Sequence, residues 1–245
     1  MNPLPLKEDL DQIYNSVQYF SEHMQYDYKK LKPSEINDLV LRIGSFHYNY
    51  LSKFISTIKS IFEIGPGGGF NLKFFADKNI NAEGIETSTI STEFAKSKLK
   101  INLINSSLED FNNSAEKKYQ VVMLNHVLEH FIDAKQAMMK IKSLVDENGY
   151  LYIRVPDHNS YDRKAQKENW PAYLPYHISY FSQKNLVLLL KQFGFTIIDI
   201  YYYVSDEFMK KYPPFIRRPM VKALELFKAE KYFNGRTITI LAKSW

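Results

Sequence analysis

Short apolar runs alternate with amphipathic stretches along most of this chain. Six runs have the length and spacing of buried strands, and they are Ser60–Ile64, Asn81–Glu86, Ile101–Ile104, Tyr119–Leu124, Tyr150–Val155 and Phe195–Tyr203. The segments between them place apolar residues at helical spacing. Strands that alternate with helices predict an α/β fold with a parallel, doubly wound sheet.

The two ends of the chain add to this pattern. Two helices are expected before the first strand, over Leu6–Lys30 and over Pro33 to about Ile58, and Pro33 suits a first helical turn. Near the other end, Arg236–Ala242 alternates apolar and polar residues and predicts a last strand. About thirty residues separate it from the strand before, which is more than a hairpin needs, so we expect an insertion at about 204–235.

Capping residues support two of the intervening helices. Asp133 is the expected N-cap of a helix through Val145, and Ser182 that of a helix to Phe193, directly before Gly194.

The segment that follows the first strand is rich in glycine. After the apolar run come Glu63 and then Gly65, Gly67 and Gly69, at every second position. Glycines let a backbone approach a ligand closely, and the next helix start offers unpaired N–H groups. The dinucleotide fingerprint requires glycine where this chain has Phe70, and the phosphate loop requires a Gly-Lys-Ser/Thr that is absent. The turn therefore predicts a cofactor of another kind.

This E-x-G-x-G-x-G pattern resembles the first motif of the class I S-adenosylmethionine-dependent methyltransferases, in particular the small-molecule branch that acts on sugars and secondary metabolites. The resemblance implies a Rossmann-like, seven-stranded mixed sheet whose last strand is antiparallel and lies beside the sixth. It also implies S-adenosylmethionine as cofactor and S-adenosylhomocysteine as product. On this basis residues 59–245 form the cofactor-binding domain, and residues 1–58 a helical cap over the active site.

An acid stands where such a fold needs one. Glu86 ends the second predicted strand about 20 residues after the glycines, the distance at which nucleotide-binding α/β folds place a carboxylate on ribose hydroxyls. A solvated surface acid is the alternative. By resemblance, Ser107 and Leu108 flank the adenine, and Asn125 and His126 lie near the methionine part. The expected cofactor-binding residues are Glu63, Gly65, Pro66, Gly67, Gly69, Glu86, Thr87, Ser107, Leu108, Asn125 and His126.

A polar cluster, His126-Val-Leu-Glu129-His130, follows the fourth strand. Its H-x-x-E-H spacing matches the inverted zinc-protease motif, but that motif needs a long helix, and here a strand ends immediately before it. Metal-dependent O-methyltransferases of the ubiquinone type carry a similar E-x-x-E-H, with an acid where this chain has His126. One carboxylate and two imidazoles suit a transition metal better than Mg²⁺. We favour the other interpretation, in which Glu129 and His130 orient the loop through hydrogen bonds and no metal binds.

The segment from Trp170 to Ser182 is aromatic and contains two prolines. It resembles the H-x-x-Y-F-[ST] segment of bacterial methyltransferases that act on sugars, lipids or secondary metabolites. His177 is the preferred general base, because an imidazole can deprotonate a hydroxyl near neutral pH, and His130 is the second catalytic candidate. The alternative is that His177 only ties the loop down through a backbone hydrogen bond. Trp170, Tyr176 and Tyr180 offer faces for the acceptor.

These features lead us to expect a methyltransferase acting on a small-molecule hydroxyl, on a sugar or glycan precursor in polysaccharide biosynthesis. The alternatives are a quinone-like phenol, a carboxylate, a lipid or a protein as acceptor, or a protein that binds the cofactor without turnover.

Composition narrows this picture further. The 245 residues carry a formal charge of +5 and an isoelectric point near 9.0, but the lysines are spread along the chain, so we expect no nucleic-acid partner. With no cysteine, disulfides, thiolate zinc sites and a cysteine nucleophile are excluded. No apolar run of about 18 residues and no signal-peptide pattern is present, so we expect a cytoplasmic protein without a transmembrane segment, which could form a homodimer.

Overall fold

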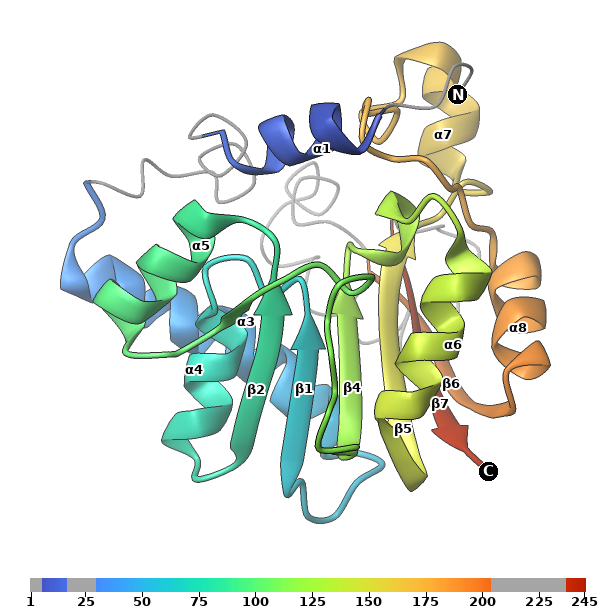
Figure 1. Ribbon diagram of the computed structural model, residues 1–245. Coiled ribbons are helices and arrows are strands. Elements are labelled where there is room, and N and C mark those ends of the chain that lie inside the picture. Colours follow the sequence, from blue (N-terminus) through green and yellow to red (C-terminus); the bar gives the residue numbers. More distant parts are fainter. Residues whose placement is uncertain (1–5, 17–29, 204–236) are drawn as a thin grey trace, which may run out of the picture.

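A seven-stranded mixed sheet forms the centre of the protein, and helices cover both of its faces (Figure 1). This computed structural model describes residues 6–16, 30–203 and 237–245. Its strands are β1 (Ser60–Ile64), β2 (Asn81–Glu86), β3 (Ile104–Asn105), β4 (Tyr119–Asn125), β5 (Val145–Pro156), β6 (Phe195–Tyr203) and β7 (Thr237–Ser244). They lie in the order β3-β2-β1-β4-β5-β7-β6. Strands β1 to β5 pair in parallel, and β7 runs antiparallel to both β5 and β6. The predicted fold class is confirmed, including the antiparallel seventh strand beside the sixth.

The fifth strand begins at Val145 instead of the predicted Tyr150, and the third strand was predicted wrongly. It was expected at Ile101–Ile104, but β3 contains only Ile104 and Asn105. Lys100 adopts a left-handed conformation with φ of +60°, and Ile101 N–H donates to the Ala95 carbonyl at 3.1 Å. Ile101 therefore completes the end of a helix, and its apolar side chain packs on the core instead of marking a strand.

The helices of the described residues begin and end as follows: α1 (Lys7–Tyr14), α3 (Pro33–Leu51), α4 (Phe70–Asp77), α5 (Thr89–Phe94), α6 (Ala134–Leu144), α7 (Tyr161–Gln166) and α8 (Gln183–Gln192). A π-helical turn, Ala95–Leu99, continues α5, and 3₁₀ turns occupy Leu128–His130 and Lys167–Asn169. No helix among these residues is long and apolar enough to cross a membrane.

The two N-terminal helices differ from their predictions. Helix α3 ends at Leu51, not near Ile58, although Ile55 and Ile58 remain buried in the core. These two residues continue the helical spacing of apolar positions, which is why the sequence predicted a longer helix. The first predicted helix is seen as α1 over its N-terminal part, and residues 17–29 lie outside the described residues, as does the expected insertion at 204–235.

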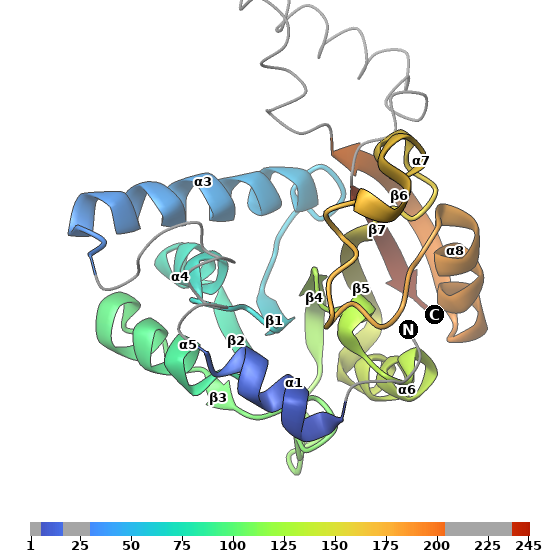
Figure 2. The same ribbon diagram turned by 90° about the horizontal axis from the view of Figure 1, so that it is seen from above.

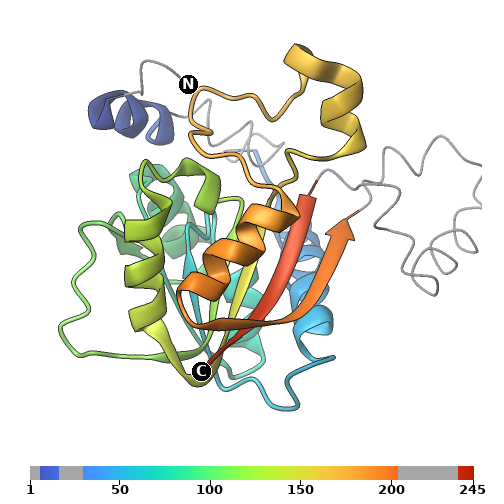
Figure 3. The same ribbon diagram turned by 90° about the vertical axis from the view of Figure 1, so that its right-hand side faces the viewer.

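The strands alternate their side chains between two apolar layers. Phe62, Val122 and Ile153 pack on one face with α6 and α8, whereas Ile61 and Met123 pack on the other with α3 and α4. Figure 2 shows α3 and α6 on opposite sides of the sheet, and Figure 3 shows α8 against β6 and β7. Because both faces are covered, a ligand can reach the sheet only at the ends of its strands, and open α/β sheets bind ligands at the carboxyl ends.

Helix α6 is fixed at its start by a side-chain cap, as predicted. Asp133 Oδ1 accepts hydrogen bonds from the backbone N–H groups of Lys135 at 2.8 Å and Gln136 at 3.1 Å. We expect Asp133→Ala to lower the free energy of unfolding by about 1 kcal/mol, since these N–H groups lose their partner. Urea unfolding measures this change, and Asp133→Ser, which keeps a capping oxygen, is the control. Equal stability of the two variants would show that the cap contributes nothing.

Candidate functional site

A cavity of about 530 Å³ opens at the carboxyl ends of β1, β2 and β4. This is the edge at which open α/β sheets bind their ligands. Of the residues predicted to bind a cofactor, the cavity is lined by Gly65, Gly67, Glu86, Thr87, Ser107, Leu108, Asn125 and His126. Segments that are far apart in the sequence thus meet at one site, as expected.

The glycine turn after β1 forms the floor of this cavity. Gly65, Gly67 and Gly69 all have positive φ, at +66°, +54° and +80°. A Cβ atom added at Gly67 would meet nothing within 4 Å, whereas one added at Gly65 would lie 2.6 Å from Val127 Cγ2. The turn thus presents bare backbone to a ligand at Gly67.

Glu86 joins the end of β2 to the glycine turn. Its Oε2 accepts a hydrogen bond from Gly67 N–H at 2.8 Å, and its Oε1 accepts one from Ser88 N–H at 2.8 Å. Burial raises the pKa of Glu86, although these N–H donors act in the opposite direction. Each carboxylate oxygen can accept more than one hydrogen bond, so the group can still bind ligand hydroxyls.

Three predicted cofactor residues do not belong to the cavity lining: Glu63, Pro66 and Gly69. The Glu63 side chain is only 2% exposed and faces α4, where its Oε2 accepts a hydrogen bond from Asn71 Nδ2 at 3.1 Å. Burial raises the pKa of Glu63 to about 7, and the Asn71 hydrogen bond opposes this. Glu63 supports the turn from below, and a contact between these three residues and a cofactor stays a prediction.

Helix α1 lies above the carboxyl ends of the parallel strands (Figure 1), and it contributes to the cavity lining. Leu10 and Tyr14 line it, and the Tyr14 hydroxyl lies 2.9 Å from His130 Nδ1. Next to it, Asn15 Oδ1 accepts a hydrogen bond from Thr89 N–H at 2.9 Å. Sequence reasoning missed these residues, since a helical pattern does not say where the helix docks.

Helix α6 supplies further lining residues that sequence reasoning missed. Gln136 and Lys140 are four positions apart and therefore share one face of the helix. No sequence motif identifies Gln136 and Lys140 as lining residues.

His126 follows β4 in an unusual backbone conformation. Its φ is +58°, although a side chain is present, and its N–H donates to the Arg154 carbonyl at 2.9 Å. His126 belongs to the cavity lining, and its imidazole Nδ1 lies 3.4 Å from Glu129 Oε1. Left-handed residues other than glycine are uncommon and collect at functional sites.

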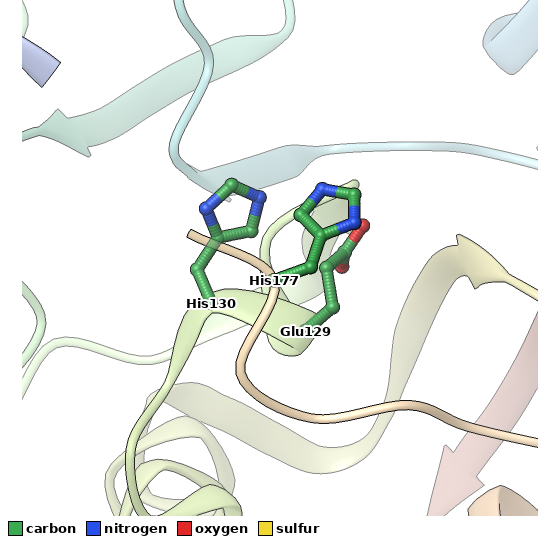
Figure 4. A group of neighbouring side chains, drawn as sticks. All are labelled: Glu129, His130 and His177. Carbon is green, nitrogen blue, oxygen red and sulfur yellow. The ribbon is translucent and has the colours of Figure 1, made fainter. Parts of the chain in front are cut away.

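Beside the cavity lies a cluster of Glu129, His130 and His177 (Figure 4), which we call the histidine cluster. One ligand-type atom of each residue lies within 4.8 Å of the others. Two hydrogen bonds tie its parts together, because Ile178 N–H and Ser179 N–H both donate to the Glu129 carbonyl, at 2.8 and 2.9 Å. His130 also lines the cavity, so the cluster borders the ligand space.

His177 is held behind His130. It is 5% exposed, does not belong to the cavity lining, and its ring centroid lies 5.0 Å from that of His130. Its Nδ1 lies 2.8 Å from the Ala172 carbonyl, which can only accept, so Nδ1 is the donor and Nε2 carries the lone pair. Burial lowers the pKa of His177, against the attraction of Glu129. The hydrogen bond that would tie the loop down, the alternative role for His177, is therefore present.

The predicted acceptor-binding aromatics lie in two groups. Tyr176 stacks on His130, with centroids 5.5 Å apart, whereas Trp170 and Tyr180 pack with His158 and Tyr173. Trp170 is buried. None of the three predicted residues belongs to the cavity lining, so their contact with an acceptor stays a prediction.

Comparison with known proteins decides the family. A family model described as a methyltransferase domain matches residues 23–200. The chain belongs to the methyltransferase domain family. Its fold is that of S-adenosylmethionine-dependent methyltransferases of known structure, so the predicted methyltransferase family and fold are confirmed, whereas the small-molecule branch stays a prediction.

Solved structures agree with this methyltransferase fold. A SAM-dependent methyltransferase from Archaeoglobus fulgidus superposes with a TM-score of 0.63 at 17% identity, over 92% of this chain and 98% of that one. Magnesium protoporphyrin IX methyltransferase from Synechocystis, solved with bound S-adenosylhomocysteine, superposes with a TM-score of 0.65 at 13% identity, over 98% and 99%.

Curated relatives match over a shorter stretch. The ubiquinone biosynthesis O-methyltransferase of Rickettsia typhi is 31% identical over 114 residues, which cover 44% of this methyltransferase and 43% of the relative. The protein of the same description from Rickettsia bellii is 26% identical over 129 residues, or 51% and 50%. The chain spans about half the length of the curated relatives it matches.

Proposed function

We propose that this methyltransferase transfers the methyl group of S-adenosylmethionine to a phenolic hydroxyl of a quinone-like small molecule. The main support for S-adenosylmethionine as cofactor is the hydrogen bond that Gly67 N–H donates to Glu86. It joins the exposed backbone of the glycine turn to a carboxylate in the cavity wall. The names of the Rickettsia relatives support a phenol over the sugar or glycan precursor expected from the aromatic segment.

The residues around the cavity suit S-adenosylmethionine. Glu86 would hold the ribose hydroxyls, Ser107 and Leu108 would flank the adenine, and Asn125 and His126 would lie near the methionine part. The bound cofactor supplies an electrophilic methyl group on a sulfonium. The protein's part is then to align an acceptor oxygen with that group and to exclude water. Helix α1 would take the latter role, whereas α3 of the expected 1–58 cap packs on the sheet face with α4 and does not line the cavity.

The acceptor hydroxyl must lose its proton as it attacks. We assign this step to the histidine cluster, with His130 in contact with the cavity and His177 as a positioning residue behind it. This reverses the order in which the two histidines ranked from sequence. The support is burial: His177 is enclosed behind the cavity wall and hydrogen-bonded to Ala172, whereas His130 forms part of that wall.

Titration calorimetry tests the cofactor. S-adenosylhomocysteine should bind with one site per chain, and NAD should not bind, since the turn lacks the third glycine of the dinucleotide fingerprint. Binding of NAD in place of S-adenosylhomocysteine would overturn the assignment.

A methyl-transfer assay then tests the acceptor. With S-adenosylmethionine as donor, phenols with a neighbouring hydroxyl or methoxy group should be methylated, and hexoses and nucleotide sugars should not. Methylation of sugars alone would restore the sugar hypothesis and reject the phenol.

A further inference from the structure

Four polar residues lie side by side across the sheet, near the carboxyl ends of the parallel strands. They are Asn125 of β4, Arg154 of β5, Thr239 of β7 and Tyr201 of β6, which we call the polar row. The strand register pairs each of them with the next. Their neighbours in the sequence, such as Leu124, Ile153 and Ile238, pack on the α6 face of the sheet. Because side chains alternate along a strand, the polar row lies on the α3 face.

The polar row begins at the cavity. Asn125 is one of the lining residues, and Arg154 lies on the next strand, at the usual strand spacing of about 4.8 Å. His126 N–H donates to the Arg154 carbonyl at 2.9 Å and so joins the two strand ends. Since Asn125 and His126 are assigned to the methionine part of the cofactor, the row extends from the place where we expect the reactive methyl group.

Arg154 gives the polar row its positive charge. Its guanidinium carbon lies 5.2 Å from the ring centroid of Phe46 in α3, a cation–π contact that helps to orient the group. His47 of the same helix adds no charge, because burial and then the charge of Arg154 lower the pKa of His47 to about 3. Arg154 is partly exposed, and a guanidinium has five N–H donors, so it can bind a ligand anion in addition to the protein groups that it contacts.

We propose that the polar row binds a carboxylate group of the acceptor, with Arg154 as the residue that selects it. A planar guanidinium matches a carboxylate through two parallel hydrogen bonds, which are stronger than those between neutral groups. The Asn125 amide and the Thr239 hydroxyl stand on either side of Arg154 in the register and supply further polar groups. An arginine at this place therefore favours an acidic acceptor over a neutral one.

This inference rests on the proposed function and narrows the acceptor to a phenolic acid. The carboxylate is the anchor and is not itself methylated. With its carboxylate at Arg154, the ring can present a hydroxyl on its other side to the cavity, where Asn125 and His130 belong to the lining. Two fixed points on one ring restrict its orientation, which is how binding of a remote group contributes to alignment in the transfer step.

Calorimetry on the full chain saturated with S-adenosylhomocysteine tests this subsite. The probe is 3,4-dihydroxybenzoate, and 3,4-dihydroxybenzamide is its neutral counterpart. The acid should bind about 10- to 100-fold more tightly than the amide, since it adds charge-assisted hydrogen bonds. Arg154→Gln should abolish this preference, and Arg154→Lys, which keeps the charge but not the planar fork, should retain part of it. Arg163→Gln is the matched control, because Arg163 Nε donates to the His158 carbonyl outside the polar row.

Binding of S-adenosylhomocysteine by each variant shows that it is folded. A wild-type protein that binds the acid no more tightly than the amide would overturn the proposal, as would an Arg154→Gln variant that keeps the preference. Methyl transfer is measured separately. A neutral catechol that is methylated as well as the acid would reject the subsite and leave the phenol hypothesis intact. Arg154-dependent binding of the acid without methyl transfer would support the subsite and reject the phenol as the methylated group.

Discussion

Replacing Gly67 by alanine should lower the affinity for S-adenosylhomocysteine roughly 100-fold, which corresponds to about 2.7 kcal/mol. The new methyl group would project from a residue of the cavity floor into open space, where the ligand is expected to touch the backbone. The φ of +54° adds about 1–2 kcal/mol of strain, which a folded domain tolerates. Calorimetry measures the affinity, and chemical unfolding measures the cost of the strain.

Gly65→Ala is the matched comparison, because Gly65 has a similar φ of +66° but no space for a Cβ atom. Its Cβ would lie 2.6 Å from Val127 Cγ2, so overpacking adds about 1–3 kcal/mol to the strain. Gly65→Ala should therefore lose clearly more stability than Gly67→Ala. If Gly67→Ala keeps full ligand affinity, the glycine turn does not contact the ligand at this residue.

Removing the Glu86 carboxylate should weaken S-adenosylhomocysteine binding by about 1–3 kcal/mol, since hydrogen bonds to a charged group are lost. Glu86→Ala also leaves Gly67 N–H and Ser88 N–H without their acceptor, at about 1–3 kcal/mol each, so stability should fall as well. Calorimetry and urea unfolding on the same preparation measure the two effects.

Glu86→Gln is the control that separates these effects. It retains one oxygen for a backbone donor but turns an NH₂ group toward the other, so we expect an intermediate loss of stability. Ligand affinity that is unchanged in Glu86→Ala would remove Glu86 from the binding site and leave it a purely structural role.

The sheet was predictable because its signals are local. Strands β1, β2 and β6 begin and end at the predicted residues, since each is a compact apolar run bounded by polar or turn residues. The predictions failed at apolar residues that pack in the core without belonging to a strand or helix. Ile101 before the edge strand and Ile55 and Ile58 after α3 are such residues. An apolar residue indicates that its side chain is buried, but it does not indicate which hydrogen bonds its backbone forms.

The site was predictable where it follows a strand end. Gly65, Glu86 and Asn125 each sit at the carboxyl end of a parallel strand, so the topology alone brings them together. Tyr14 and His177 depend on how a helix and a loop dock, through bonds to His130 and Ala172 that no spacing encodes. For the same reason sequence favoured His177 over His130 as the base, because its motif was visible and its burial was not.

The left-handed backbone at His126 has a consequence for how this protein can change. A glycine would hold φ at +58° with less strain than a residue that carries a Cβ atom, so backbone strain alone favours glycine here. The chain nevertheless has histidine in this cavity-lining position, with Nδ1 3.4 Å from Glu129 Oε1. A design that scored backbone strain alone would choose glycine at this position and would leave the buried carboxylate of Glu129 without the imidazole beside it.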